Sequence, residues 1–137
     1  MGTIRREVII DRPPDDVWPL IGDPEAIAGW FPGMVAATVD GTSRIITAAS
    51  GIPLPEEIVT NDPILRRFQY RVVAPMLRSH LGTVDVFDLH DGRSLVSYST
   101  DADPDPVALV IGGATGNALK ELKRQLETDE RGGTTRG

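Results

Sequence analysis

The sequence predicts an α+β domain that combines one antiparallel sheet with one long C-terminal helix. Residues 4–33 carry a strand pattern followed by two short helix patterns, and residues 34–100 carry strand patterns only. The last segment has helical periodicity and is long, over residues 107–126. A sheet crossed by a single long helix encloses space between the two layers. This order of elements therefore predicts a hollow domain that can hold a ligand.

The first strand and the two short helices are marked by prolines. The strand is expected at Val8–Ile10 and ends before Pro13 and Pro14, which lack the backbone donors of a sheet. Either proline can occupy the first turn of a helix. Asp23 is a suitable N-cap for a second short helix, with Pro24 at its first position.

The middle of the chain alternates between strand-forming runs and turns. The runs are Met34–Val39, Arg44–Ala49, Leu54–Thr60, Leu65–Val73, His80–Leu89 and Ser94–Thr100. Asp-Gly at 40–41 and Asn-Asp-Pro at 61–63 are typical hairpin signals. Alternation places Phe68, Tyr70 and Val72 on the same, buried face of their strand. One antiparallel sheet of six or seven strands follows.

The C-terminal helix is expected to begin at one of the two Asp-Pro pairs in residues 103–106, with the aspartate as N-cap. Its apolar stripe consists of Val107, Val110, Ile111, Ala114, Ala118, Leu122 and Leu126. Gly112, Gly113 and Gly116 lie inside this helix, and each costs roughly 1 kcal/mol relative to alanine. Close backbone packing, or space left for a bound molecule, would explain them.

Length and composition restrict the class of protein. A chain of 137 residues makes one domain, expected over residues 1–127, with a flexible polar tail over 128–137. The net charge of −6, with scattered acidic residues, argues against nucleic acid as a partner. Without cysteine there are no disulfides and no thiolate metal sites. The sequence has no signal-peptide core and no membrane-spanning run, so we expect a cytoplasmic monomer or homodimer without membrane insertion.

Two motifs that suggest cofactors have simpler explanations. Asp101, Asp103 and Asp105 are spaced like the start of a calcium loop, but Pro106 stands where that loop needs glycine. The glycines at 112–116 fit neither the dinucleotide-binding nor the phosphate-loop pattern. We therefore expect no metal and no organic cofactor.

Three polar side chains are candidates for chemistry. Strand parity places His80 on the same buried face as Val84, where it is either a core histidine or a pocket histidine that serves as base or proton shuttle. Tyr70 and Tyr98 also lie on apolar faces. They are either ordinary core tyrosines or ligand contacts, and the sequence favours neither interpretation.

The neighbouring residues Glu56 and Glu57 look like a carboxylate pair. As neighbours on a strand they point to opposite faces of the sheet, so they cannot act as a dyad. Glu57 is expected to pair across the sheet with an arginine such as Arg44 or Arg71.

Several segments together carry a resemblance to a known superfamily. They are Val8–Trp18, Ile21–Pro24, Ile27–Pro32, Glu56–Ile58 with Asn61–Pro63, Arg67–Tyr70 and Gly92–Val96. In them the chain resembles the START-related, helix-grip superfamily (SRPBCC), and within it the polyketide cyclase/dehydrase and lipid-transport family. The resemblance implies a curved, seven-stranded antiparallel sheet wrapped around the long C-terminal helix, with two short helices closing one end. It also implies a cavity for apolar or aromatic small molecules.

Three classes of function are compatible with this sequence. The first is binding of a hydrophobic or aromatic, lipid- or polyketide-like molecule in the cavity. Its expected lining is Trp30, Phe31, Met34, Tyr70, Val72, His80, Val84, Tyr98, Ile111 and Thr115. The second is a cofactor-independent cyclase, dehydratase or isomerase, in which His80 is the base and Tyr70 or Tyr98 donates to an enolate oxygen. The third is a protein-interaction module of a stress or toxin–antitoxin system.

Overall fold

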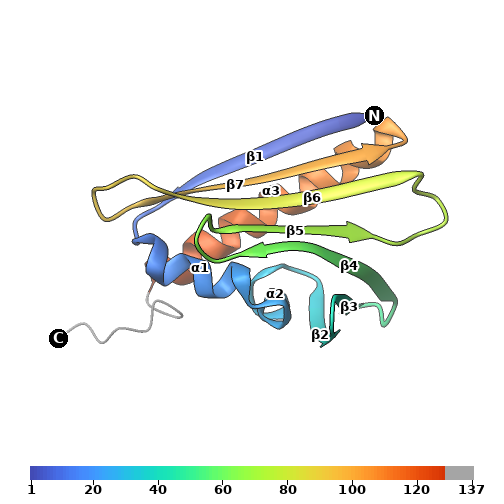
Figure 1. Cartoon of the computed structure of the whole chain (residues 1–137), viewed down its shortest axis with the longest axis horizontal. Helices are drawn as coiled ribbons and strands as arrows, with labels where there is room; N and C mark the ends of the chain where they lie inside the picture. Colours follow the sequence, from blue (N-terminus) through green and yellow to red (C-terminus); the bar gives the residue numbers. More distant parts are fainter. Residues whose placement is uncertain (129–137) are drawn as a thin grey trace.

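Seven antiparallel strands form one sheet, in the order β1-β7-β6-β5-β4-β3-β2 (Figure 1). The strands are β1 (Gly2–Ile10), β2 (Met34–Asp40), β3 (Ser43–Ala48), β4 (Pro53–Asp62), β5 (Arg67–Val72), β6 (Ser79–Asp88) and β7 (Ser94–Asp103). The long helix α3 (Asp105–Glu127) lies along the sheet and packs against β1 and β7. This computed structural model describes residues 1–128, and it confirms the predicted α+β helix-grip architecture.

The short helices follow β1, as predicted. Helix α1 (Pro14–Gly22) begins at a proline, and the carboxylate of Asp23 accepts a hydrogen bond of 3.1 Å from the Glu25 N–H. This cap begins the 3₁₀ turn η1 (Pro24–Ala26), which continues into α2 (Ile27–Trp30). Figure 1 shows α1 and α2 at the end of the sheet where α3 finishes. None of the helices in residues 1–128 is long and apolar enough to cross a membrane.

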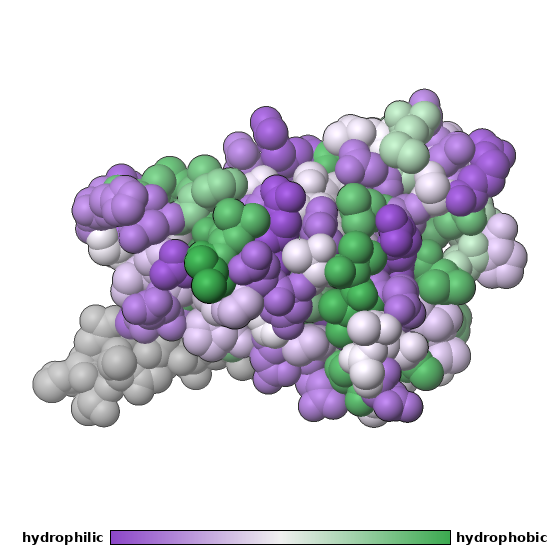
Figure 2. All heavy atoms as spheres, viewed as in Figure 1, coloured by the Kyte–Doolittle hydropathy of each residue, from purple (hydrophilic) through white to green (hydrophobic). Residues whose placement is uncertain are grey.

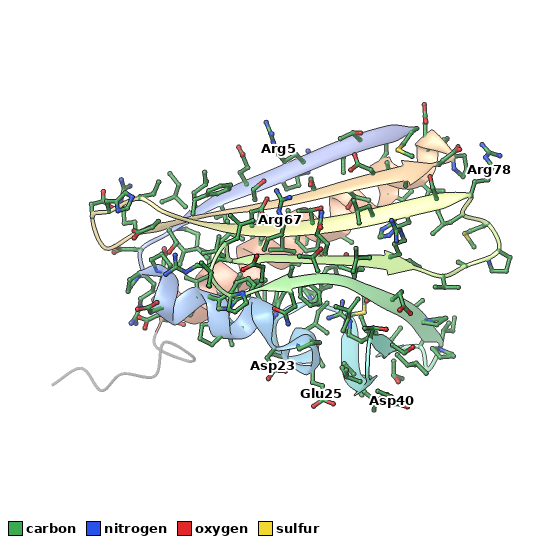
Figure 3. All side chains as sticks on the ribbon, in the orientation of Figure 1. Arg5, Asp23, Glu25, Asp40, Arg67 and Arg78 are labelled. Carbon is green, nitrogen blue, oxygen red and sulfur yellow. The ribbon has the colours of Figure 1, made fainter. Side chains whose placement is uncertain are left out.

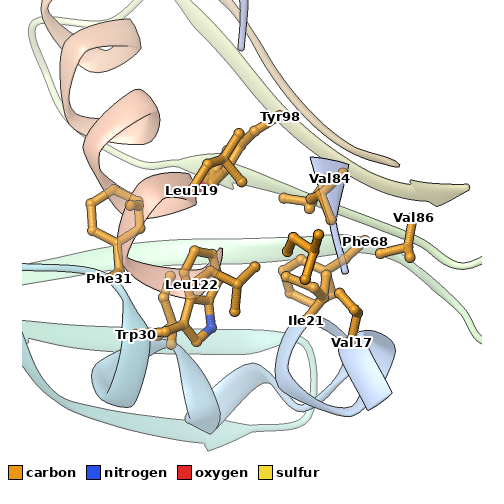
Figure 4. Packing of buried hydrophobic residues seen from close by; sticks show 14 of the residues in the cluster. Val17, Ile21, Trp30, Phe31, Phe68, Val84, Val86, Tyr98, Leu119 and Leu122 are labelled. Atoms are coloured by element: carbon orange, nitrogen blue, oxygen red, sulfur yellow. The ribbon is translucent and has the colours of Figure 1, made fainter. Parts of the chain in front are cut away.

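The core fills the end of the domain that these short helices close. Figure 4 shows Leu119 and Leu122 of α3 facing side chains from α1 and the sheet. In the other half of α3, Leu109 and Val110 are 67% and 77% exposed. Val110, which belongs to the predicted stripe, is therefore exposed, and the N-terminal half of α3 does not pack into this core.

The start of α3 also differs from the prediction. The N-cap position is Pro104, so neither Asp103 nor Asp105 caps the helix with its side chain. Asp103 still belongs to β7, and its carboxylate lies 2.6 Å from the guanidinium of Arg78. The ion pair links the end of β7 to the residue that precedes β6.

The three glycines of α3 have different surroundings. A Cβ at Gly112 would lie 2.7 Å from the side chain of Ile4, so close packing on β1 requires glycine there. A Cβ at Gly116 would make an ordinary contact of 3.5 Å with Arg6. A Cβ at Gly113 would have no atom within 4 Å apart from its chain neighbours and the helix's own backbone, so packing does not explain this glycine.

The predicted C-terminal tail lies outside the described residues, apart from Thr128. Its hydroxyl donates a 2.7 Å hydrogen bond to the Arg124 carbonyl at the end of α3. The predicted domain end at residue 127 and the flexible tail after it stay predictions.

Candidate functional site

A pocket of about 330 Å³ lies between the N-terminal half of α3 and the inner face of the sheet. Strands β3 to β7, the start of β2, helix α2 and the loop of residues 73–78 also contribute to it. Its lining is Ile27, Phe31, Met34, Ile46, Leu54, Glu56, Tyr70, Val72, Ala74, Met76, Leu77, His80, Tyr98, Val107, Val110, Ile111, Ala114 and Thr115. Most of these side chains are apolar, and the polar ones come from the sheet and from one threonine of α3.

The rim of the pocket is apolar as well. Met76 in the loop before β6 and Val110 on α3 are 73% and 77% exposed, although both belong to the lining. Among the charged side chains labelled in Figure 3, Arg5 and Arg67 lie on the outer side of the sheet and Arg78 lies at its end. The exposed residues of the lining are therefore apolar.

The one charged side chain in the lining, among residues 1–128, is Glu56, which forms a buried ion pair with Arg44. The Nε and Nη2 groups of Arg44 donate to the same oxygen, Oε1, at 2.9 and 2.6 Å. The remaining terminal nitrogen of Arg44 donates to the Pro24 carbonyl at 2.9 Å. Burial raises the pKa of Glu56, and the opposing effect of Arg44 is smaller.

Aromatic rings hold Arg44 in place. Its guanidinium carbon lies 5.1 Å from the ring centre of Phe68 and 5.3 Å from that of Tyr70, within the range of cation–π attraction. The sequence-based pairing of Glu57 with Arg44 or Arg71 is wrong for Arg44, because Glu57 accepts instead from the Thr42 hydroxyl at 2.6 Å.

Next to this ion pair, the hydroxyl groups of Tyr70 and Tyr98 form a hydrogen bond with each other. Burial raises the pKa of both phenols, so both are neutral in the physiological range. The bond uses one of the two hydroxyl protons and leaves the other as a potential donor. Gly82 makes this arrangement possible, because a Cβ there would lie 2.5 Å from the Tyr70 ring.

His80 lies beside Tyr70, with 5.6 Å between the ring centres. Its Nδ1 accepts a 3.0 Å hydrogen bond from the Val72 backbone N–H, which requires a lone pair on Nδ1. Burial lowers the pKa of His80, partly opposed by Asp101, so the ring is neutral and carries its proton on Nε2. Nε2 is buried and has no hydrogen-bond partner in the described part of the chain.

This geometry argues against the base role that was expected for His80. The only lone pair of the neutral ring is already engaged by Val72, so accepting a substrate proton would break that bond. The imidazole is instead arranged as a hydrogen-bond donor.

Most of the predicted ligand contacts come together in this pocket. Those that line it are Phe31, Met34, Tyr70, Val72, His80, Tyr98, Ile111 and Thr115. Trp30 and Val84 are not part of its lining; they are 4% and 2% exposed and belong to the core. The Trp30 indole donates to the Leu20 carbonyl at 3.1 Å, which holds it against α1.

Sequence reasoning missed the ion pair of Arg44 and Glu56. The two residues lie directly opposite each other in the β3–β4 pairing. Strand alternation could have revealed the pair, because it places Arg44 on the same inward face as Ile46 and Glu56 on the same face as Leu54.

The polyketide cyclase / dehydrase and lipid transport family model matches residues 1–128. No curated protein matches the chain. Among solved structures, the protein XoxI from Bacillus cereus has a TM-score of 0.88 and 21% identity, covering 95% of this chain and 99% of that one. The di-domain ARO/CYC BexL of the BE-7585A biosynthetic pathway has a TM-score of 0.79 and 20% identity, covering 95% and 48%.

Norcoclaurine synthase from Thalictrum flavum, in complex with dopamine and hydroxybenzaldehyde, has a TM-score of 0.72 and 15% identity, covering 93% of this chain and 87% of that one. At these identities the solved structures show a common fold. The family match spans all described residues and confirms the resemblance seen in the sequence. The chain belongs to the polyketide cyclase/dehydrase and lipid-transport family.

Proposed function

We propose that this protein binds a compact hydrophobic or aromatic molecule in the pocket beneath the N-terminal half of α3. The observation that carries the proposal is the largely apolar lining, interrupted by a few polar side chains of the sheet and by Thr115 of α3. Specific ligand pockets combine apolar walls with a few such groups. The volume of about 330 Å³ is at the small end of the usual range of roughly 300–1,000 Å³, which favours a molecule of two or three rings over a two-chain lipid.

The apolar walls supply the affinity. A two-ring ligand with about the surface of a tryptophan side chain, roughly 200 Å², gains about 5 kcal/mol on burial before the costs of association. Binding by the walls alone is therefore weak, and the polar groups must add affinity and orientation. The comparison with norcoclaurine synthase supports this proposal, since that protein holds dopamine and hydroxybenzaldehyde on the same fold.

The experiment that tests the proposal blocks the pocket from α3. Ile111→Trp places a larger side chain into the cavity, whereas Leu109→Trp adds the same side chain at an exposed position outside the lining. Fluorescence titration with the neutral dye N-phenyl-1-naphthylamine should show saturable binding to the wild type and to Leu109→Trp, and none to Ile111→Trp. Equal binding to all three proteins would refute the proposed site.

A second candidate function is proton-transfer catalysis in the same pocket, and the position of Glu56 favours it. Both bonds from Arg44 end on Oε1, so Oε2 keeps its lone pairs, and burial raises the pKa of the carboxyl, which makes it a stronger base once ionised. In this scheme Oε2 removes a proton from a carbon next to a ligand carbonyl. The electron pair moves to the carbonyl oxygen, and the resulting enolate accepts hydrogen bonds from His80 and the tyrosine pair. Glu56 then returns the proton to carbon.

Deuterium exchange tests this chemistry without knowledge of the natural substrate. If the scheme is right, the protein accelerates exchange of the methyl protons of 2-acetylnaphthalene in D₂O, and Glu56→Gln abolishes the acceleration while the ketone still binds. Exchange at the uncatalysed rate with saturated wild-type protein would leave ligand binding as the function.

A further inference from the structure

We propose that the pocket selects an uncharged ligand whose acceptor oxygen is bound by the Nε2–H of His80, and that it rejects carboxylates. The inference rests on the proposed binding function and specifies its ligand class. Three features of the structure support it: the fixed orientation of the imidazole, the tyrosine pair beside it, and the charges of the lining.

The imidazole is oriented by the backbone of the neighbouring strand. The 3.0 Å bond from the Val72 N–H to Nδ1 fixes both the tautomer and the rotation of the ring, because turning the ring would leave that N–H unpaired. His80 is 4% exposed and belongs to the lining. Its Nε2–H is thus a buried donor without a partner in residues 1–128, a state that is unfavourable until an acceptor arrives.

The tyrosine pair beside the His80 ring also has a donor to offer. The tyrosine pair retains one hydroxyl proton, and the ring of Tyr70 lies against that of His80. A carbonyl, ether or amide oxygen has lone pairs to accept from both. A pure hydrocarbon satisfies neither donor.

The charges of the lining argue against an anion. Glu56 is the one charged residue of the lining among residues 1–128, and all three guanidinium nitrogens of Arg44 already donate within the protein. Arg78, next to the lining residue Leu77, is paired with Asp103. A ligand carboxylate would lose its hydration and find no free cation in the lining, with the carboxylate of Glu56 in the same cavity.

Three naphthalene probes of nearly equal size test this selectivity by calorimetric titration at pH 8. They are 2-acetylnaphthalene with a neutral acceptor, 2-ethylnaphthalene without an acceptor, and 2-naphthoate with a charged one. The wild type should bind the ketone about three- to tenfold more tightly than the hydrocarbon, which is the usual gain from a neutral hydrogen bond. It should bind the carboxylate at least tenfold more weakly than the ketone.

His80→Asn is the informative variant, because the Asn oxygen can replace Nδ1 as acceptor for Val72 while the distal donor is lost. It should bind ketone and hydrocarbon equally. His90→Asn, at the exposed histidine of the β6–β7 turn, is the matched control and should keep the preference of the wild type. Nitrogen-15 NMR of wild-type imidazole should show protonation at Nε2 only.

The outcomes distinguish a wrong role for His80 from a wrong binding function. Equal binding of ketone and hydrocarbon to the wild type, or a proton on Nδ1, overturns the role of His80 and leaves the pocket intact. Tighter binding of 2-naphthoate than of the ketone overturns the charge argument. Failure of all three probes to bind overturns the proposed binding function, and this inference with it.

Discussion

Removing the arginine of the buried ion pair should destabilise the protein strongly, and the loss should depend on pH. In Arg44→Met the apolar stem is kept, but Glu56 loses both hydrogen bonds and its counter-charge. The buried carboxyl will then take up a proton. Protonating a carboxyl of ordinary pKa 4.5 at pH 7 costs about 3.4 kcal/mol, because pH 7 lies 2.5 units above that pKa and each unit costs about 1.4 kcal/mol.

A second loss in Arg44→Met is independent of pH. The Pro24 carbonyl loses the donor that Arg44 supplies at 2.9 Å, which costs about 1 kcal/mol. The free energy of unfolding should therefore fall by about 4 kcal/mol at pH 7 and by about 2 kcal/mol at pH 5, where neutralising Glu56 costs only about 0.7 kcal/mol. The sign follows from linkage: Arg44 lowers the pKa of Glu56, so removing it raises that pKa further, and the deficit of the variant relative to wild type grows as pH rises above 4.5.

Urea denaturation of wild type and variant at both pH values measures this difference. The double variant Arg44→Met/Glu56→Gln is the control, because without a titratable carboxyl the deficit relative to wild type should change much less with pH. An Arg44→Met deficit that is equal at pH 5 and pH 7 would refute the reasoning, as would a deficit below about 1 kcal/mol at pH 7.

Three further predictions concern the helix, the tyrosine pair and the histidine. Gly113→Ala should raise the free energy of unfolding by up to about 1 kcal/mol. Gly112→Ala should lower it, because the added Cβ would lie 2.7 Å from the side chain of Ile4 on β1. Denaturant unfolding of the wild type and both variants measures these changes. Gly82→Ala should cost about 1–3 kcal/mol and shift the near-UV signal of the tyrosines, since its Cβ would displace the ring that crosses it. NMR titration of His80 should give a midpoint below 6.5, because the effect of burial on its pKa outweighs the attraction of Asp101. The free energy of unfolding should therefore decrease as pH falls below 6.5, because the folded state keeps the ring neutral while the unfolded state takes up a proton. A midpoint above 6.5 would contradict the burial argument.

The architecture was predictable because it is encoded in local patterns. Alternation with period two placed Tyr70, His80 and Tyr98 on the inner face, and the structure brings their rings together. Proline and aspartate at 13–14 and 23–24 correctly marked the two short helices. These signals depend on neighbours in the chain, so a single sequence reveals them.

The predictions that failed are those that depend on contacts between segments far apart in the sequence. The pairing of Arg44 with Glu56 depends on the β3–β4 register, which the hydrophobic pattern alone does not specify. Val84 has the parity of a pocket residue and Trp30 lies on the apolar face of α2, but both belong to the packed core at the end of the sheet where α1 lies. Val110 follows the helical stripe and is nevertheless exposed, because α3 borders a cavity at that point rather than packed side chains.

The outer face of the sheet bears on the third class of function. Figure 2 shows apolar atoms on this face in narrow bands separated by hydrophilic ones, not in one broad patch. A docking surface for a protein partner is usually a larger continuous apolar area. This face therefore gives less support to an interaction module than the pocket gives to a small-molecule ligand.

The central claim is that a neutral aromatic molecule binds in the pocket beneath the N-terminal half of α3. The most direct test is to locate a bound neutral aromatic ketone. Intermolecular NOEs between 2-acetylnaphthalene and the methyl groups of the isotope-labelled protein report this position. The account predicts contacts to Val72, Leu54 and Ile111, from the two layers that enclose the pocket. Saturable binding with contacts only to exposed methyl groups of the outer sheet face, such as Ile45, would contradict it.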